Sequence, residues 1–188
     1  MRRILWQCLI LVALASTACT TLRAQEIVHA LTGLVTAVNP ADNSITVKTN
    51  DGSEGYFKYE KNLRTSIEFD KSVRDEATEP STYNKVGDRV VVYFFGDGQA
   101  RTVVALRDLG KAPLDVSSGT VVKTRSGSLI IKNQAGVTET YQFAKDAIAE
   151  TSDGVVSGLR FHPDKGAQIT VRYREVSGNK VAQFVRAD

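Results

Sequence analysis

Cysteine, methionine and tryptophan are nearly absent from this chain, and the places of the few copies exclude several kinds of chemistry. Both cysteines, Cys8 and Cys19, the only methionine, Met1, and the only tryptophan, Trp6, lie within the first 20 residues. Beyond that point the chain has no disulfide bond, no thiol nucleophile and no soft sulfur ligand for copper. The stability of the folded part must therefore come from packing.

Histidine is also scarce, and neither copy belongs to a recognisable site. His29 stands among apolar residues and His162 precedes Pro163, and neither has a cysteine or a second histidine at the spacing of a zinc site. The serines in segment 126–128 flank a glycine as in a hairpin turn, without the glycines of a nucleophile elbow. We therefore predict no catalytic residue, no metal site and no cofactor.

The chain has no excess of one charge once its first residues are set aside. It holds 24 Lys+Arg against 21 Asp+Glu, but Arg2, Arg3 and Arg23 precede the first acid, Glu26, and without those three the count is 21 against 21. Nucleic-acid binders need clustered Lys and Arg to neutralise phosphates, whereas the basic residues here alternate with acids. We predict that nucleic acid is not a partner.

The first residues have the pattern of a secretion signal. Arg2 and Arg3 form a basic start, Ile4 to Ala15 is apolar, and small residues follow. The apolar run is shorter than the roughly 20 residues of a membrane-spanning helix. We therefore predict an exported protein.

Two processing sites compete, and they predict different attachments. Cleavage after Ala24 would remove residues 1–24 and release a soluble protein, which is the form we favour. Cleavage after residue 18 would leave Cys19 at the new N-terminus as a lipid site. We predict a periplasmic or extracellular location, with an outer-membrane lipid anchor at Cys19 as the alternative and no other membrane contact.

The chain repeats itself, once over residues 31–110 and again over residues 117–188, with a linker at 111–116 that contains Pro113. A repeat this long indicates two small domains rather than a solenoid, whose repeats are roughly 20 to 50 residues long. The matching segments, first copy and then second, are Thr32–Val35 and Ser118–Val121, Ser44–Lys48 and Ser128–Lys132, Phe57–Lys61 and Tyr141–Lys145, and Gly87–Val92 and Gly166–Val171.

Alternation of apolar and polar residues predicts about five strands in each copy, separated by turns rich in glycine, asparagine and aspartate. In the first copy the strands are predicted at 34–38, 45–48, 56–60, 90–94 and 102–106. Between the third and fourth strands, segments 70–84 and 146–165 would hold a short helix or an irregular loop.

We predict an all-β protein built from two tandem five-stranded antiparallel barrels, either OB-like or SH3-like, with an open pair of sheets as the alternative. Domains this small bury only about 60% of their unfolded surface. The two copies are therefore expected to pack against each other in a monomeric chain.

Two groups of residues are candidates for ligand binding. The first copy is rich in aromatic residues, and its run 91–95 is apolar on both faces of a strand. One face must be core; burial between the copies is favoured for the other, and a binding patch is the alternative. The second group is acidic and stands in a loop, where solvated turns are the default reading. The candidates are Tyr56, Tyr83, Tyr93, Phe95, Asp75 and Glu76, with Asp70 and Glu79 beside the acids.

Four motifs support a resemblance to a known family: Gly33-x-Val35, Ser44-Ile45-x-Val47, Thr65 and Val86-Gly87-Asp88-x-Val90-x-Val92. With these residues each copy resembles the small exported bacterial domains grouped as domain-of-unknown-function family 5666, which implies an OB-like β domain and no known activity. A more distant likeness is to the periplasmic copper-binding accessory proteins of metal efflux systems. Their methionine and tryptophan ligands have no counterpart beyond residue 20, so copper binding does not carry over.

The function expected from these observations is that of a non-catalytic, exported binding or structural module of the cell envelope. Its partner would be an envelope protein or a glycan. The alternative is a periplasmic protein that binds a small ligand or a cation through the acidic loop. An enzyme with a site assembled from distant residues is the least favoured reading.

Overall fold

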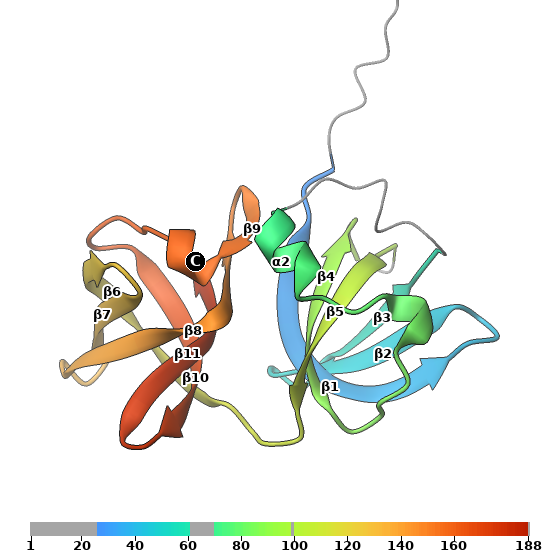
Figure 1. Ribbon diagram of the computed structural model, residues 1–188, viewed down its shortest axis with the longest axis horizontal. Coiled ribbons are helices and arrows are strands. Elements are labelled where there is room, and N and C mark those ends of the chain that lie inside the picture. Colours follow the sequence, from blue (N-terminus) through green and yellow to red (C-terminus); the bar gives the residue numbers. More distant parts are fainter. Residues whose placement is uncertain (1–25, 61–69, 99, 188) are drawn as a thin grey trace, which may run out of the picture.

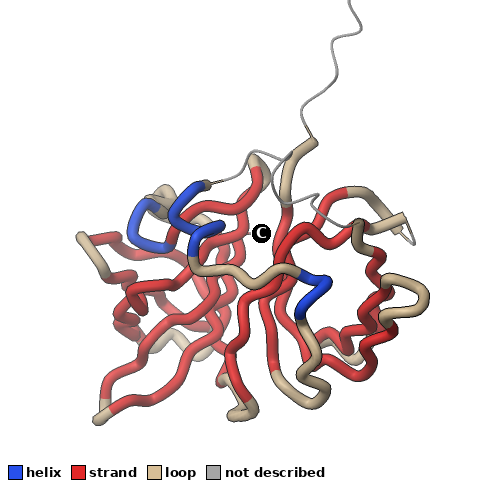
Figure 2. The backbone as a smooth tube through the Cα atoms, turned by 45° about the vertical axis from the view of Figure 1, so that its right-hand side comes forward, coloured by secondary structure: helices blue, strands red, loops and turns tan. Residues whose placement is uncertain are grey.

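The computed structural model describes residues 26–60, 70–98 and 100–187, and it shows an all-β protein of two barrels side by side (Figure 1). Strands run through both barrels, and helix is confined to short pieces (Figure 2). The predicted signal segment 1–24, the candidate lipid site Cys19 and the motif residue Thr65 lie outside the described residues. No helix within the described ranges combines the length and the apolar composition that crossing a membrane requires.

The first barrel closes in the order β1-β2-β3-β5-β4. Its strands are β1 (His29–Asn39), β2 (Ser44–Thr49), β3 (Glu54–Lys58), β4 (Arg89–Phe95) and β5 (Thr102–Gly110). β1 is long enough to pair with β2 at one end and β4 at the other, and β3 meets β5 in parallel at Lys58 and Thr102. This order is OB-like rather than SH3-like, a choice that the sequence had left open.

A short helical segment crosses between the third and fourth strands of the first barrel, as predicted for residues 70–84. It contains α2 (Lys71–Asp75) and the 3-10 turn η2 (Pro80–Thr82). Asp70 caps α2, because its carboxylate accepts a 2.9 Å hydrogen bond from the backbone of Ser72. Val73 points from this helix into the contact between the barrels.

The second barrel repeats the strand order of the first. Its elements are β6 (Asp115–Arg125), β7 (Ser128–Asn133), β8 (Thr138–Thr151), β9 (Gly154–Ser157), η3 (Gly158–Arg160), β10 (Gln168–Val176) and β11 (Asn179–Ala187). The sheet order is β11-β10-β6-β7-β8-β9, and an additional parallel pairing of β11 with β8 closes five of these strands into a ring. β9 is an added sixth strand beside β8.

The prediction for segment 146–165 was wrong in its main part. β8 continues to Thr151 and folds back as β9, so only η3 is helical. The reason is burial: Ala147, Ile148 and Ala149 are at most 2% exposed, and buried backbone groups need hydrogen-bond partners. The ladder with β11, in which Ile148 is paired with Phe184, supplies them.

The glycine of the repeated Gly-x-Val motif is required by a close approach of two strands in both barrels. A Cβ atom at Gly33 would lie 2.6 Å from the carbonyl oxygen of Lys48, and one at Gly119 would meet that of Lys132 even more closely. Real Cβ contacts essentially never fall below 3.0 Å. The motif therefore marks where the first two strands of each barrel cross.

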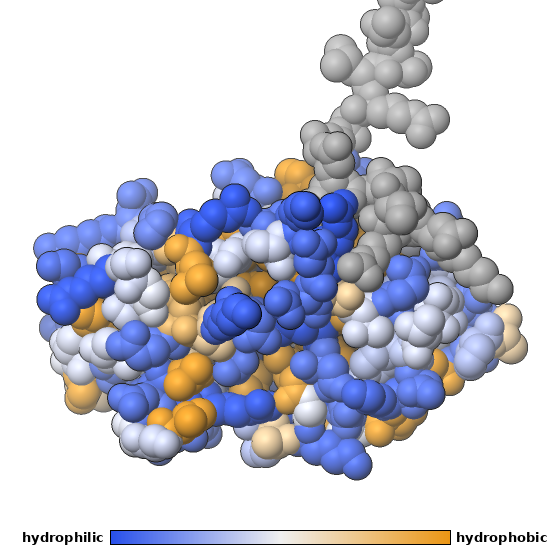
Figure 3. Space-filling model, viewed as in Figure 1, coloured by the Kyte–Doolittle hydropathy of each residue, from blue (hydrophilic) through white to orange (hydrophobic). Residues whose placement is uncertain are grey.

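Three clusters of buried apolar residues hold the molecule together, one inside each barrel and one between the barrels. β4 contributes to two of them: Val90 and Val92 face the interior of the first barrel, whereas Val91 and Tyr93 face the second barrel. The two copies therefore pack against each other, as expected. On the face shown in Figure 3, the remaining apolar side chains form small groups among hydrophilic ones.

The connection between the barrels is short. β5 ends at Gly110 and β6 begins at Asp115. The guanidinium of Arg174 donates hydrogen bonds to the carbonyl oxygens of Leu109 and Ala112, which ties the connection to β10.

Candidate functional site between the two barrels

A cavity of about 320 Å³ lies between the barrels, and three arginines line it. We call it the arginine pocket, after Arg101, Arg172 and Arg186. β1 and the β2–β3 turn form its wall on the first barrel, and β10 and β11 form its wall on the second.

Strand geometry places two of the arginines together. On the β10–β11 hairpin, Thr170 is paired with Arg186, and Arg172 is paired with Phe184. Residues two apart on a strand point to the same face, and cross-strand partners share that face. These four side chains therefore form one patch, which is the second barrel's wall of the pocket.

Arg172 has an unusual electrostatic setting. Its side chain is partly buried, and none of the described residues gives it an ion pair or a hydrogen bond. Burial lowers the pKa of its guanidinium, and the like charges of Arg89 and Arg186 lower it further, although Asp51 acts in the opposite direction. A cation placed among cations in a recess favours an anionic partner.

Arg101 is held from the side of the first barrel by aromatic rings. Its guanidinium carbon lies 5.3 Å from the centre of the Phe94 ring and 5.9 Å from that of Phe57. Cation–π contacts of this kind orient a guanidinium without neutralising it. Arg101 is therefore positioned at the pocket while keeping its charge.

The β2–β3 turn supplies the polar part of the wall. Asp51 accepts hydrogen bonds from the hydroxyl of Thr49 and from the backbone and hydroxyl of Ser53, which lower the pKa of its carboxyl to about 2. Asn50 donates to the carbonyl and the hydroxyl of Thr32 at 2.9 and 2.8 Å. The pocket thus combines three cations with one fixed acceptor and several hydroxyl groups.

Glu150 joins the barrels next to the pocket. Its carboxylate accepts a hydrogen bond from the backbone of Ala30 at 2.7 Å and lies 2.7 Å from the Nδ1 atom of His29. Burial raises the pKa of Glu150, and these hydrogen bonds and the charge of Arg186 act against the rise. Arg186, which lines the pocket, is paired with Glu150 in the β8–β11 register. Because Glu150 also contacts His29 and Ala30 of β1, it joins the two walls of the pocket.

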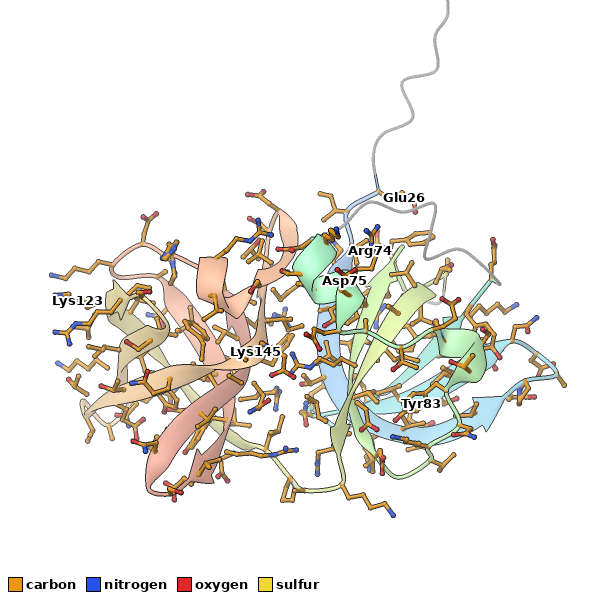
Figure 4. The ribbon with its side chains drawn as sticks, in the orientation of Figure 1. Glu26, Arg74, Asp75, Tyr83, Lys123 and Lys145 are labelled. Carbon is orange, nitrogen blue, oxygen red and sulfur yellow. The ribbon has the colours of Figure 1, made fainter. Side chains whose placement is uncertain are left out.

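The four aromatic residues that the sequence singled out do not form one binding patch. Tyr93 is fully buried between the barrels, and Phe95 packs partly buried against the same cluster. Tyr83 is buried in the core of the first barrel (Figure 4), and Tyr56 is exposed on β3. None of the four lines the arginine pocket.

The acidic candidates are likewise dispersed. Asp75 lies exposed at the end of α2 (Figure 4). Glu76, the C-cap residue of that helix, is also exposed. Asp70 joins the barrels instead: besides capping α2 it accepts a 3.3 Å hydrogen bond from the backbone of Ser157 and pairs with Arg160. Burial alone would raise the pKa of Asp70, but its hydrogen bonds lower it. Within the described part of the chain, no three His, Cys, Asp or Glu residues gather as metal ligands would.

A separate polar cluster on the second barrel was also missed by sequence reasoning. The carboxylate of Glu139 pairs with Lys180 and accepts hydrogen bonds from Tyr141 at 2.9 Å, Ser117 at 3.1 Å and Asn133 at 3.2 Å. These contacts lower the pKa of Glu139 to about 2. The cluster ties β6, β7, β8 and β11 together.

No family model and no curated protein matches this chain. The resemblance to domain-of-unknown-function family 5666 therefore stays a prediction, and the function has to be argued from the pocket.

Proposed function

We propose that the protein is a non-catalytic, exported binding module of the bacterial cell envelope, and that it holds an acidic glycan in the arginine pocket. The observation that carries the proposal is Arg172, a partly buried cation that faces other arginines and has no carboxylate partner among the described residues. Export is supported by the pattern of the first 24 residues.

The chemistry of the pocket favours a carboxylated sugar among anions. Guanidinium groups match the planar geometry of a carboxylate. The carboxylate of Asp51 can accept hydrogen bonds from sugar hydroxyls. The volume of about 320 Å³ lies at the lower end of the roughly 300–1,000 Å³ of ligand pockets, which suits a short saccharide.

Titration calorimetry with digalacturonate and with a neutral galactose disaccharide tests the proposal. We expect the full chain to bind the acidic sugar and not the neutral one, and the affinity to fall with added salt because the contact is ionic. Equal binding of the two sugars, or the absence of binding to the acidic one, would contradict the proposal.

The Arg172→Met variant separates binding from folding. It should lose about tenfold or more in affinity, a change of about 1.4 kcal/mol or more. The free energy of unfolding in urea should rise by about 1 kcal/mol, because the variant removes a desolvated cation that repels its neighbours. Lys123→Met, on the exposed surface of β6 (Figure 4), is the matched control and should change neither quantity. If Arg172→Met bound the sugar like the original chain, the pocket would not be the site.

A further inference from the structure

A second cavity, of about 210 Å³, lies between the barrels and shares no lining residue with the arginine pocket. α2, β4 and β5 form its wall on the first barrel, and β8 and β9 form much of its wall on the second. Lys145 stands on the side of the second barrel that faces the first (Figure 4).

Arg107 lines this cavity and is buried with incomplete pairing. The residue is 3% exposed. Its Nη2 atom makes only long hydrogen bonds to Gln183, at 3.4 and 3.5 Å, and its Nε atom lies 3.6 Å from a carboxylate oxygen of Asp146. The Nε and Nη1 atoms are buried and have no hydrogen-bond partner at ordinary geometry, although the hydroxyl of Tyr93, which also lines the cavity, interacts with the guanidinium. A buried guanidinium with unused donors calls for an acceptor in the cavity that it lines.

In the duplicated chain, the second cavity is the counterpart of the arginine pocket. Val91 is paired with Arg107 on the β4–β5 hairpin, as Thr170 is paired with Arg186 on the β10–β11 hairpin. The same register position in each barrel thus directs an arginine to a cavity between the barrels. Tyr93 stands where Arg172 stands in the other copy, so the second cavity has one cation fewer at its base.

The remaining lining residues of the second cavity favour a different ligand from the acidic sugar of the arginine pocket. Val73, Ala147, Ile148 and Leu159 make the cavity apolar on several sides. At the rim of the cavity, the positive charge of Lys145 is offset by the negative charges of Asp146 and Glu76. A ligand with several negative charges would therefore find too few cations to balance them. The volume is room for about seven waters at roughly 30 Å³ each, or for one short organic acid.

We propose that the second cavity binds a small aliphatic monocarboxylate, whose carboxylate accepts a hydrogen bond from Nη1 of Arg107 and whose hydrocarbon body lies against Val73, Ile148 and Leu159. This site is independent of the acidic-glycan proposal, because its residues and its ligand differ.

Titration calorimetry of the full chain with isovalerate tests the site, with isovaleramide as the uncharged match and isoamylamine as the cationic one. We expect the carboxylate to bind and the amide and the amine to bind at least tenfold more weakly. Binding of the amide as tight as that of the acid, or no binding of isovalerate, would overturn the proposal.

Two variants locate the binding. Arg107→Met removes the donor, and Leu159→Trp narrows the cavity at a residue that is 47% exposed and therefore tolerant of substitution. Both should weaken isovalerate at least tenfold, while Arg172→Met should leave it unchanged. If Arg107→Met does not fold, Leu159→Trp decides alone. Unchanged affinity in Leu159→Trp, or lost affinity in Arg172→Met, would place the ligand elsewhere.

Discussion

At the scale of single residues, the two barrels differ most where they face each other. Arg186 and Arg107 occupy matching register positions, but Arg172 stands where the first barrel has Tyr93. The alternating pattern of β10 predicts an outward side chain at 172 and is typical of a solvated strand face. The recess around Arg172 exists only because β1 and the β2–β3 turn cover this face of β10. Sequence reasoning therefore missed the pocket's arginines.

Glu139 provides a prediction on acid stability at the same scale. The hydrogen bond from Lys180, followed by those from Tyr141, Ser117 and Asn133, lowers the pKa of Glu139 from 4.5 to about 2. A carboxyl whose pKa is lowered by folding stabilises the protein fully above its unfolded value, and that contribution is lost as the pH falls from about 4.5 towards 2.

The measurement is the melting temperature of the full chain and of Glu139→Gln between pH 7 and pH 3. Glu139→Gln should be less stable at pH 7, and the difference should shrink below about pH 4.5. Glu54→Gln, on β3 of the first barrel, is the control and should follow the original chain. A difference that stays constant down to pH 3 would contradict the assigned role.

At the scale of elements, the sequence pattern was accurate for the strands of the first copy, including β4, which is buried on both faces. The predicted strands 45–48 and 90–94 lie within β2 and β4. It was wrong at 146–165, because β8 is buried there on account of the other barrel and of β11, which alternation along one segment does not report. The repeated Gly-x-Val motif marks a close strand crossing in both barrels, which the structure identifies.

Gly119→Ala tests that crossing. The added Cβ would collide with the backbone of Lys132, which cannot move without disturbing the β6–β7 ladder. We expect the free energy of unfolding in urea to fall by about 1–3 kcal/mol. Val122→Ala, exposed on the same strand, should cost less than about 0.5 kcal/mol. A loss at Gly119 no larger than that of the control would show that the strands can separate at no cost.

At the scale of the whole molecule, we expect the apolar cluster between the barrels to make them one folding unit. Val91 and Val92 offer a matched pair, since both are 0% exposed but Val91 faces the second barrel and Val92 the interior of the first. Because both lose the same buried methyl groups, each change to alanine should cost about 2 kcal/mol in chemical unfolding, with a single transition. Independent barrels would instead make Val91→Ala nearly neutral.

The sequence by itself determined the two copies and most of their strands, because alternation, turn residues and repeated motifs are local along the chain. It also restricted the chemistry, since cysteine, methionine and tryptophan occur only before residue 20. The tertiary structure alone decided the closure of β3 on β5 and of β8 on β11, and the burial of Arg107 and Arg172. The arginines are buried because one barrel removes water from the surface of the other, and each closure joins strands that are distant in sequence. The alternation along a single strand does not identify such distant neighbours.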